Sequence, residues 1–444
     1  MGNRISDEKY EDALAFLYAQ LPMFSRVGAA AYKPGLERVE ELSRFFNNPE
    51  KKLKAIHIAG TNGKGSTSHL IASVLQSAGY KTALYTSPHL VDFRERMKIN
   101  GEMIPKERVV KFVERWKSSD YSGERPSFFE LTMMMAFDWF ASENVDYAVI
   151  ETGMGGRLDS TNIISPLLCV ITNISPDHTQ FLGSTLKEIA GEKAGIIKKG
   201  IPVVIGEAEG DVEEVFRTHA ADKEAPLIEA YNHPFAHSFR LKEDYSGWIA
   251  ESEPIGTLEV DLAGDYQKKN INTSLAAIDA LKKIGINLST EAIKNGLKNA
   301  SSISGLKGRW SVLSLTPLTI CDTGHNIGGL SINMERLRKI IGSSSESSRL
   351  RMLIGFVADK AIDEILDIFP KNAEYYVTNA DIPRALPAAE LLKKCQEHGL
   401  SAREFRNVDD AWNEIAKDAS EQDVIYIGGS TFIVADFLRT HPQL

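Results

Sequence analysis

The sequence predicts an α/β protein with two unequal parts: a mainly parallel sheet domain with a small antiparallel addition, followed by a smaller α/β domain. Three observations lead to this prediction. Short apolar strands alternate with helical patterns, a glycine-rich turn joins an early strand to a helix, and the alternation restarts after a serine- and glycine-rich stretch near residue 305. Such alternation is typical of parallel strands joined by crossover helices.

Composition favours a globular protein that acts on small molecules. The chain has 444 residues, too many for one ordinary core, with 43% hydrophobic and 25% charged residues. Its net charge of −9 argues against nucleic acid or an anionic membrane as a partner. Cys169, Cys321 and Cys395 are isolated in or near apolar runs, so neither a disulfide framework nor a zinc site is indicated. The N-terminus lacks an apolar export core, and we expect a cytoplasmic protein.

Residues 57–70 form an apolar strand, a glycine turn with one lysine, and the start of a helix. Such a turn binds polyphosphate, because its backbone N–H groups point inward, its lysine lies near the outer phosphates and a hydroxyl follows for magnesium. The sequence therefore predicts a P-loop and ATP as a substrate. The residues expected to bind the nucleotide are Gly60, Thr61, Asn62, Gly63, Lys64, Gly65, Ser66 and Thr67.

This loop departs from the standard pattern. Only Thr61 and Asn62 separate its first two glycines, which is a shortened spacer, and Gly65 follows Lys64, so the hydroxyl arrives one residue late at Ser66. The alternative interpretation is a glycine-rich turn with a solvated lysine. The order of strand, turn and helix favours the P-loop.

The remaining elements of the first domain follow in alternation. The expected strands span residues 82–85, 147–150 and 168–171, and the expected helices span residues 64–79, 105–118, 127–143, 270–284 and 289–299. Between about 207 and 260 the pattern weakens into short alternating segments, which predict the antiparallel addition. Residues 301–308 are rich in serine and glycine and predict a hinge. We therefore expect domains at residues 1–303 and 304–444.

The second domain is predicted to be a doubly wound, Rossmann-like unit. Its expected strands lie near residues 318–322, 351–356, 374–378 and 423–427, with helices between them and after the last. The serine run at residues 343–348 predicts a surface loop.

Polar residues follow the strands where such sheets bind ligands. Glu151 ends a strand and precedes three glycines in five residues, so its carboxylate suits magnesium. His178 follows the neighbouring strand; with Asp177 it is either a helix cap or a member of the same site. Together with Ser66, these residues predict a magnesium site formed by three strand ends.

Two interpretations of Lys193 are open. We expect it near the start of a helical segment at residues 188–197, either as a surface lysine paired with Glu188 or Glu192, or as part of the metal site. A bare ammonium would repel magnesium, whereas carbamylation by carbon dioxide would turn the lysine into a carboxylate.

Two groups of the second half also carry chemistry. Arg309 at the hinge would reach phosphate when the domains close, which also excludes water from a reactive intermediate. Asp322 follows a strand and is either an ordinary helix cap or, with His325 and Asn326, part of a site.

These motifs resemble the folylpolyglutamate synthase and dihydrofolate synthase branch of the Mur ligase superfamily. The short glycine spacing and the glycine after the lysine are the form that this branch uses. Matching motifs follow in order over nearly the whole chain: the P-loop, Tyr85-Thr-Ser-Pro-His-Leu90, Arg94-Glu-Arg96, Phe128-Phe-Glu130, residues 151–162, Asp177-His178, residues 191–195, Gly308-Arg309 and residues 322–326. The departures are small: Lys307 stands where the family often has proline, and Thr323, Gly324 and Ile327 replace commoner residues.

The resemblance implies an ATP-dependent ligase with a Mur-type central domain and a glutamate ligase domain. ATP would phosphorylate the carboxylate of dihydropteroate, of a reduced folate or of both, and the amino group of L-glutamate would attack the acyl phosphate. Phosphorylation is needed because a free carboxylate is a poor electrophile. The products would be dihydrofolate or folylpolyglutamate, ADP and phosphate. The resemblance further implies two magnesium ions and a monomer.

It also implies roles for single residues. Lys64 would hold the β and γ phosphates, Ser66 and Glu151 one magnesium, and Glu151 with His178 a second. Lys193 matches the lysine that is carbamylated in family members. The expected catalytic residues are Lys64, His178, Lys193 and His325.

The same resemblance assigns the remaining contacts. Asn270, Arg309 and Asp322 would contact ATP, and His325 would lie near the γ-phosphate and the incoming glutamate. Ser87 and Ser430 match positions implicated in holding that glutamate. The pterin pocket would use Ser87, Pro88, His89, Phe128 and Phe129, although the two phenylalanines are equally consistent with a core role.

Two other functions stay open at this point. One is a related ATP-dependent amide ligase acting on a different acid. The other is a nucleotide-binding switch that controls a protein partner, but this leaves Arg309 and residues 322–326 without a role.

Overall fold

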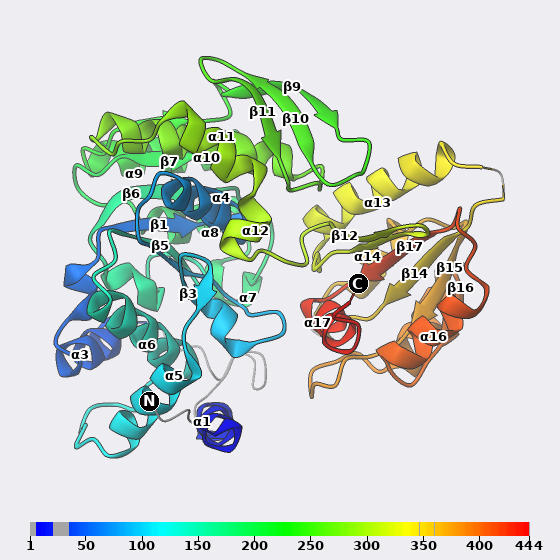
Figure 1. Cartoon of the computed structure of the whole chain (residues 1–444), viewed down its shortest axis with the longest axis horizontal. Helices are drawn as coiled ribbons and strands as arrows, with labels where there is room; N and C mark the ends of the chain where they lie inside the picture. The colour runs from blue at the N-terminus through cyan, green and yellow to red at the C-terminus, as the bar shows by residue number, and fades with distance from the viewer. Residues whose placement is uncertain (1–5, 21–34, 346, 359, 444) are drawn as a thin grey trace.

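The computed structural model describes residues 6–20, 35–345, 347–358 and 360–443. Two α/β units lie side by side, the first blue to green and the second yellow to red (Figure 1). Among the described residues the strands form sheets of eight, three and six strands. The predicted fold class is confirmed: a mainly parallel sheet, a small antiparallel addition and a second α/β unit. The first five residues and Glu346 of the serine run lie outside the described residues.

The large sheet of the first unit has the order β4-β3-β2-β5-β1-β6-β7-β8. Its strands are β1 (Ala55–Ala59), β2 (Thr82–Tyr85), β3 (Met97–Ile99), β4 (Glu102–Met103), β5 (Tyr147–Glu151), β6 (Pro166–Ile171), β7 (Val203–Ile205) and β8 (Leu227–Glu229). Strands β3 and β4 are antiparallel at one edge, and the other neighbours pair in parallel. The loops that follow β1, β2, β5 and β6 therefore meet at one edge of the sheet.

Helices cover both faces of this sheet. One face packs against α1 (Asp7–Gln20), α5 (Lys106–Lys117) and α6 (Phe128–Ser142), and the other against α4 (Lys64–Ser77), α10 (Gln267–Lys283) and α11 (Thr290–Lys298). Burial on both faces explains why β1 is buried at every position. The remaining helices are α3 (Glu37–Phe45), η2 (Pro49–Lys52), η3 (Phe93–Arg96), η4 (Ser160–Ile163), α7 (Thr179–Leu182), α8 (Leu186–Ala194), α9 (Asp211–Asp222) and α12 (Ala300–Ser304).

The antiparallel addition consists of β9 (Ala236–Leu241), β10 (Trp248–Ser252) and β11 (Gly256–Val260). It begins later than the sequence predicts, because α9 and β8 occupy the first part of residues 207–260. Helix α9 was missed although its buried residues Val212, Val215, Phe216 and Ala220 have helical spacing. The region therefore contains one helix and one parallel strand that the sequence-based prediction lacked.

The second unit is a six-stranded sheet with the order β12-β13-β17-β14-β15-β16. Its strands are β12 (Ser311–Leu315), β13 (Leu318–Cys321), β14 (Leu350–Ile354), β15 (Ala373–Val377), β16 (Ser401–Glu404) and β17 (Val424–Gly428), and its helices are α13 (Ile327–Gly342), α14 (Ile362–Asp367), α15 (Ala388–Glu397), α16 (Val408–Asp418) and α17 (Thr431–Thr440). Only β12 is antiparallel to its neighbour. The two edge strands β12 and β16 were not predicted, because they are partly exposed and not continuously apolar.

The prediction of a hinge over residues 301–308 is wrong for its first half. Helix α12 reaches Ser304 and packs against α4. Serine and glycine obscured this helix in the sequence, but Gly305, with φ of +70°, is the residue that ends it. The crossing between the two units is therefore confined to the residues that follow Ser304.

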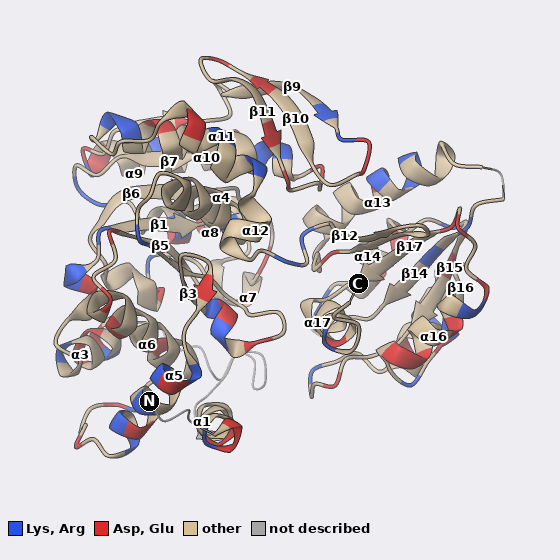
Figure 2. Ribbon diagram, viewed as in Figure 1, with Lys and Arg blue, Asp and Glu red and all other residues tan. Residues whose placement is uncertain are grey.

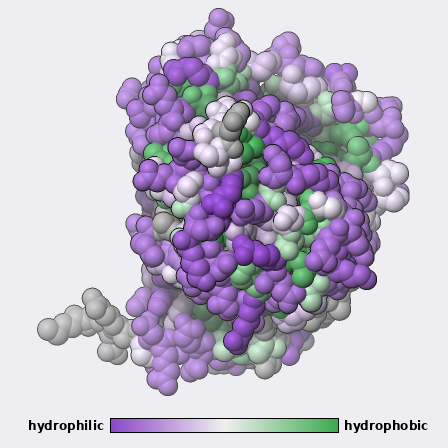
Figure 3. Space-filling model, turned by 90° about the vertical axis from the view of Figure 1, so that its right-hand side faces the viewer, coloured by the Kyte–Doolittle hydropathy of each residue, from purple (hydrophilic) through white to green (hydrophobic). Residues whose placement is uncertain are grey.

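Charged residues of both signs alternate along α5, whereas α16 carries mainly acidic residues (Figure 2). On the face of the molecule turned to the viewer in Figure 3, hydrophobic residues form small separate groups among hydrophilic ones. Within the described part of the chain, none of the helices combines the length and the hydrophobicity needed to span a membrane.

Candidate active site

A cavity of about 580 Å³ lies between the two units. Its walls are loops that follow the strands of both parallel sheets, where open α/β sheets bind ligands. Most predicted site residues line it: Thr61, Asn62, Gly63, Lys64, Gly65, Ser66, Ser87, Pro88, Phe128, Phe129, Glu151, His178, Asn270, Arg309, Asp322, His325 and Ser430. The structure therefore brings these residues together around one cavity.

The P-loop is held rigidly by the loop after β6. The Thr61 and Asn62 N–H groups donate to the main-chain and side-chain oxygens of Asn173 at 2.9 and 2.8 Å. Gly63 has φ of +84°, and a Cβ there would overlap the Asn270 amide oxygen. Only glycine satisfies both conditions, because it tolerates this backbone conformation and leaves room for Asn270. The loop is thus shaped before any ligand arrives.

Two lysines converge on the carbonyl oxygen of Gly60. Lys64 Nζ donates to it at 2.9 Å and to the Thr61 carbonyl at 3.2 Å, and Lys193 Nζ donates to it at 3.0 Å. Gly60 itself does not line the cavity, and neither does Thr67, which is buried in α4. Of the predicted loop residues, these two therefore support the loop from behind.

Lys193 differs from the sequence-based prediction in its place on the helix and in its partners. It lies in the last turn of α8, not near its start, because Thr185 and Glu188 form a capping box that begins the helix earlier. Its side chain is buried and does not line the cavity. The surface pairing is wrong as well, since Glu188 caps the helix and Glu192 pairs with Arg157. Burial, with the nearby Lys64 charge, lowers the pKa of Lys193 to about 7.

Oxygen ligands suitable for a divalent cation lie beside the P-loop. The buried Glu151 carboxylate accepts the Ser87 N–H at 3.1 Å, and a Cβ on Gly65 would lie 3.8 and 4.0 Å from its two oxygens. Burial raises the pKa of Glu151, and the Lys64 charge opposes that shift. Ser66 presents its hydroxyl from the first turn of α4 and accepts a hydrogen bond from Gln267 at 3.1 Å. Carboxylate and hydroxyl oxygens fit magnesium.

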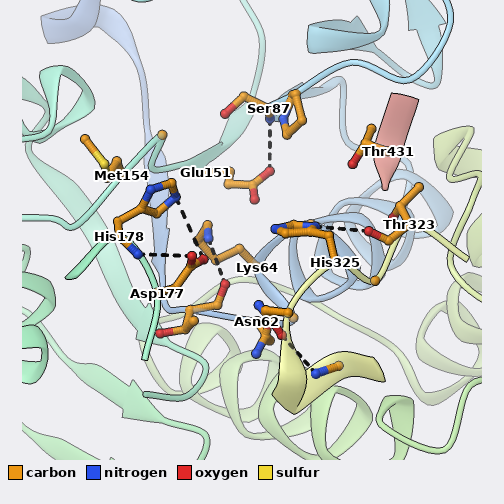
Figure 4. A pocket seen from close by; sticks show the side chains of 18 of the residues that line it. Asn62, Lys64, Ser87, Glu151, Met154, Asp177, His178, Thr323, His325 and Thr431 are labelled. Carbon is orange, nitrogen blue, oxygen red and sulfur yellow. Dashed lines mark hydrogen bonds and ion pairs between the residues drawn. The ribbon is translucent and has the colours of Figure 1, made fainter. Parts of the chain in front are cut away.

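His178 and Asp177 follow β6 on the same side of the cavity (Figure 4). His178 begins α7 with φ of +49°, and its ring forms no cap, so the alternative reading as a helix cap is wrong. Asp177 lies 3.8 Å from His178 Nε2 and 3.4 Å from Lys360 Nζ of the second unit. Burial would raise the pKa of Asp177, but the His178 and Lys360 charges outweigh it and hold this pKa at about 2. A charged pair therefore crosses the cavity.

Within residues 6–20, 35–345, 347–358 and 360–443, no three His, Cys, Asp or Glu side chains come together as a ready-made metal site. Ser66, Glu151 and His178 therefore provide only some of the ligands that a divalent cation needs. Such a set suits a cation that also binds a nucleotide's phosphates, because magnesium is usually held by one or two carboxylates plus substrate oxygens.

The second unit contributes Arg309 and Asp322 to the cavity. Arg309 donates to Thr323 Oγ1, and its Nη2 would lie 3.9 Å from a Cβ on Gly65 of the P-loop. Asp322 is buried and accepts from the Trp310 N–H at 2.8 Å and the Tyr266 hydroxyl at 2.6 Å. Asp322 is not the helix cap that the sequence allowed. Asn326 caps α13, and its amide also donates to Asn62 at 3.0 Å.

His325 has a defined tautomer. Its Nδ1 lies 3.1 Å from the Thr323 carbonyl oxygen, which can only accept, so Nδ1 carries the hydrogen. Burial lowers the pKa of His325 to about 4, so the ring is neutral near pH 7. Nε2 is therefore a hydrogen-bond acceptor on a residue that lines the cavity (Figure 4).

Two aromatic residues also line the cavity. Phe129 is partly exposed and lines it, whereas Phe128 also lines it but is buried and stacks on Tyr18 with ring centroids 5.7 Å apart. Phe128 thus fits both interpretations, as core residue and as cavity wall. The prediction of His89 as a lining residue is wrong: its ring accepts from Arg96 at 2.8 Å and packs near Phe93.

Some lining residues were missed by sequence reasoning. Asp177 was named in the sequence together with His178, but its contact with Lys360 was not predicted. Lys360 and Arg384 follow strands β14 and β15 as single polar residues without a motif. Tyr266, which precedes the predicted Asn270, also lines the cavity, and only the fold shows that its hydroxyl bonds to Asp322. Gln267 is buried outside the lining and donates to Ser66.

Two family models match the chain. The Mur ligase middle domain covers residues 58–278, and the Mur ligase glutamate ligase domain covers residues 308–431. Fold and site together therefore define a ligase of the Mur kind.

Dihydrofolate synthase/folylpolyglutamate synthase of Bacillus subtilis (strain 168) is 32% identical over 449 residues, covering 97% of this chain and 98% of that protein. The chain belongs to the dihydrofolate synthase/folylpolyglutamate synthase family.

Solved structures agree with this assignment. E. coli FolC in complex with DHPP and ADP superimposes with a TM-score of 0.82 at 29% identity, over 98% of this chain and 97% of that one. The bifunctional folylpolyglutamate synthase/dihydrofolate synthase from Yersinia pestis, complexed with AMPPNP and Mn ion, gives 0.79 at 30% identity over 97% of both chains.

Proposed function

We propose that this chain is an ATP-dependent ligase that phosphorylates the carboxylate of dihydropteroate, a reduced folate or both, and joins it to L-glutamate. One observation carries the proposal: Lys64 and Arg309, from two different units, meet at the P-loop in a cavity that also contains Glu151, His178 and His325. The family to which the chain belongs, and the two related structures that contain a bound nucleotide, support the proposal. The boundary between the two functional units lies just after Ser304, one residue later than the sequence predicts, because α12 ends there and packs on the first unit.

The first half of the reaction uses the P-loop side of the cavity. A carboxylate oxygen of the folate substrate attacks the γ-phosphorus of ATP, the bond to the β-phosphate oxygen breaks, and ADP leaves. Negative charge that develops on the transferring phosphoryl group is stabilised by Lys64 and Arg309. The ATP contacts are completed by Asn270, which packs over Gly63. Asp322, whose oxygens are engaged within the protein, holds Trp310 and so orients the neighbouring Arg309.

Divalent cations fit the first unit's side of the cavity. Ser66 and Glu151 would hold one magnesium, and Glu151 with His178 would help hold a second. When bound, magnesium offsets charge on the phosphates and orients them. The buried position of Glu151 between the P-loop and the Ser87 N–H supports this role.

The second half of the reaction uses His325. The amino group of glutamate must be neutral to attack the acyl phosphate, so a proton has to leave its ammonium form. That proton would leave to solvent, and the neutral Nε2 of His325, a weak base because burial lowers its pKa to about 4, would accept a hydrogen bond from the amine and orient it for attack. Attack then forms the amide bond, and phosphate departs. Ser87 and Ser430, which line the same cavity, would hold the glutamate carboxylates.

The folate substrate would lie against Ser87, Pro88, Phe128 and Phe129. A flat heterocycle stacks well on aromatic rings, and the partly exposed Phe129 is suited to it. His89 has no part in this pocket, because its ring is engaged by Arg96.

Lys193 is proposed to be carbamylated. Its neutral amine would attack carbon dioxide, form a C–N bond and release one proton, giving a carboxylate. Burial and the neighbouring Lys64 charge both disfavour the ammonium form, which supports the modification. In bicarbonate-containing buffer, intact-protein mass spectrometry after trapping should show one carbamate on the wild type and none on Lys193→Ala. A Lys193→Ala variant with full activity would refute the metal-supporting role.

We further propose a cytoplasmic monomer. All three cysteines are buried and unpaired, as expected in a reducing compartment.

The proposal is tested by ADP release with dihydropteroate and with a reduced folate in parallel, each with and without L-glutamate. ADP release that depends on glutamate, with a product heavier by one glutamyl residue, is expected for at least one acid. No signal with either acid would leave a related amide ligase acting on a different acid. Slow hydrolysis that ignores glutamate and responds to a protein would instead indicate a nucleotide switch.

A further inference from the structure

The chain segment that crosses between the two units is fixed at its start by the first unit. Ser304, the last residue of α12, and Gly305 offer their carbonyl oxygens to Lys98 Nζ at 3.0 and 2.8 Å. Lys98 belongs to β3 near one edge of the large sheet and is buried, with 4% of its surface exposed. The Ser304 hydroxyl also lies 2.7 Å from Nδ1 of His69, which is part of the P-loop helix α4.

Close packing reinforces these bonds. The turn between β3 and β4 approaches α12 so closely that a Cβ on Gly101 would overlap the Ile303 carbonyl oxygen. A Cβ on Gly305 would lie only 2.8 Å from Lys98 Nζ. The Leu306 N–H still bonds to the Ser301 carbonyl oxygen at 3.1 Å. The backbone is therefore held by the first unit as far as Leu306.

The second unit takes hold of the chain almost immediately afterwards. The Gly308 carbonyl oxygen accepts from the Thr323 N–H and hydroxyl, both at 3.0 Å. The Trp310 N–H donates to Asp322 at 2.8 Å. Lys307, exposed to solvent, is the one residue between the last bond to the first unit and the first bond to the second. Any rotation of one unit against the other must be absorbed at residues 306–308.

We infer that Lys98 is a positioning residue that confines bending between the units to residues 306–308 and so directs Arg309 to the P-loop. Arg309 follows this bend directly, and its guanidinium Nη2 would lie 3.9 Å from a Cβ on Gly65. A looser start of the crossing segment would let the second unit swing more widely and displace that guanidinium. The consequence for turnover rests on the proposed function, whereas the mechanical role does not.

The first test measures distances between the units. Spin labels at Asp222→Cys and Gln396→Cys, both exposed sites, report the interdomain distance by electron double resonance. In Lys98→Met the distance distribution should broaden about twofold, because both carbonyl contacts are lost. Lys98→Arg retains donors and should restore a narrow distribution. Lys307→Met, a matched control at the exposed lysine of the bend, should resemble the wild type.

A second test asks whether Lys98 acts through Arg309. Lys98→Met should weaken ADP affinity about tenfold, and in an Arg309→Ala background the same change should have less than about a twofold effect. Unchanged distances and affinity in Lys98→Met, or equal losses in both backgrounds, would overturn the inference. If Lys98→Met fails to fold, Lys98→Gln replaces it in both tests, because its shorter side chain cannot keep both carbonyl contacts; a distance distribution and an ADP affinity identical to those of the wild type would overturn the inference. The distance and ADP-affinity measurements need neither folate nor glutamate. Both therefore test the role of Lys98 even if the proposed reaction is wrong.

Discussion

The two sides of the cavity are built by different means. On the first unit's side, the P-loop and Glu151 lie at strand ends and are fixed by main-chain hydrogen bonds within that unit. On the second unit's side, Arg309 depends on the crossing segment for its position, and Lys360 lies near Asp177 of the opposite unit. The first side is preformed, whereas the second is complete only when the units are correctly placed.

The two sides also differ in charge. Glu151 and Asp177 supply carboxylates from the first unit, and Arg309 and Lys360 supply cations from the second. Lys64 is the cation of the P-loop itself, and Arg38, Arg96 and Lys269 also line the first unit's side. A nucleotide held at the P-loop would attract Arg309 and Lys360 of the second unit, which connects substrate binding with closure.

The largest effect should come from the preformed side. Lys64→Met removes the cation that faces the phosphates, and turnover should fall by about a hundredfold to a thousandfold in an ADP-release assay. Lys52→Met, on the exposed surface near β1, should keep wild-type turnover. Turnover of Lys64→Met within a few-fold of the wild type would show that the P-loop does not serve phosphoryl transfer.

Glu151→Gln should have the next largest effect. The amide preserves shape but removes a negative metal ligand, so turnover should drop about a hundredfold and half-saturation should require more magnesium. Activity measured against magnesium concentration distinguishes this from a general loss. An unchanged magnesium dependence would exclude Glu151 as a ligand.

The pair that crosses the cavity should matter less. Lys360→Met and Asp177→Asn should each lower turnover about tenfold, and the double variant should lose little more, because one interaction is removed in all three. Fully additive losses would mean that the two side chains act independently and that the pair does not help closure.

The smallest effect concerns pH and the crossing segment. Burial lowers the pKa of Lys98 to about 8, below its unfolded value of about 10.4. Between these values the unfolded chain binds more protons, so the free energy of unfolding should rise with pH. Relative to Lys98→Met, the wild type should gain about 2 kcal/mol from about pH 8 to about pH 10 in denaturant titrations. Parallel curves for the two proteins would contradict this shift.

Sequence reasoning recovered the preformed side well. The P-loop and Glu151 stand next to strands whose apolar pattern is clear, so local motifs and the rule for parallel sheets suffice to bring them together. It failed for Lys193, since burial of a lysine behind the P-loop depends on the packing of α8 against residues that are distant in sequence.

The other side was recovered only in part. Arg309 and His325 belong to short motifs, but Lys360 is a lone residue after a strand, and its pairing with Asp177 spans 183 positions in sequence. The hinge prediction for the crossing segment was partly wrong for a related reason. Its serine and glycine content indicates a flexible segment, but Lys98 and His69, which are distant in sequence, hold its first residues in place. Contacts between residues far apart in the chain are therefore the part of the site that could not be predicted from the sequence.

The central claim is that both sides of the cavity cooperate to make an acyl phosphate. Dihydropteroate or a reduced folate labelled with ¹⁸O in its reacting carboxylate, incubated with ATP and L-glutamate, tests this most directly. One labelled oxygen should appear in inorganic phosphate for each amide formed, because the carboxylate oxygen that attacks the γ-phosphorus leaves with it. Unlabelled phosphate at the same yield of amide would contradict the account.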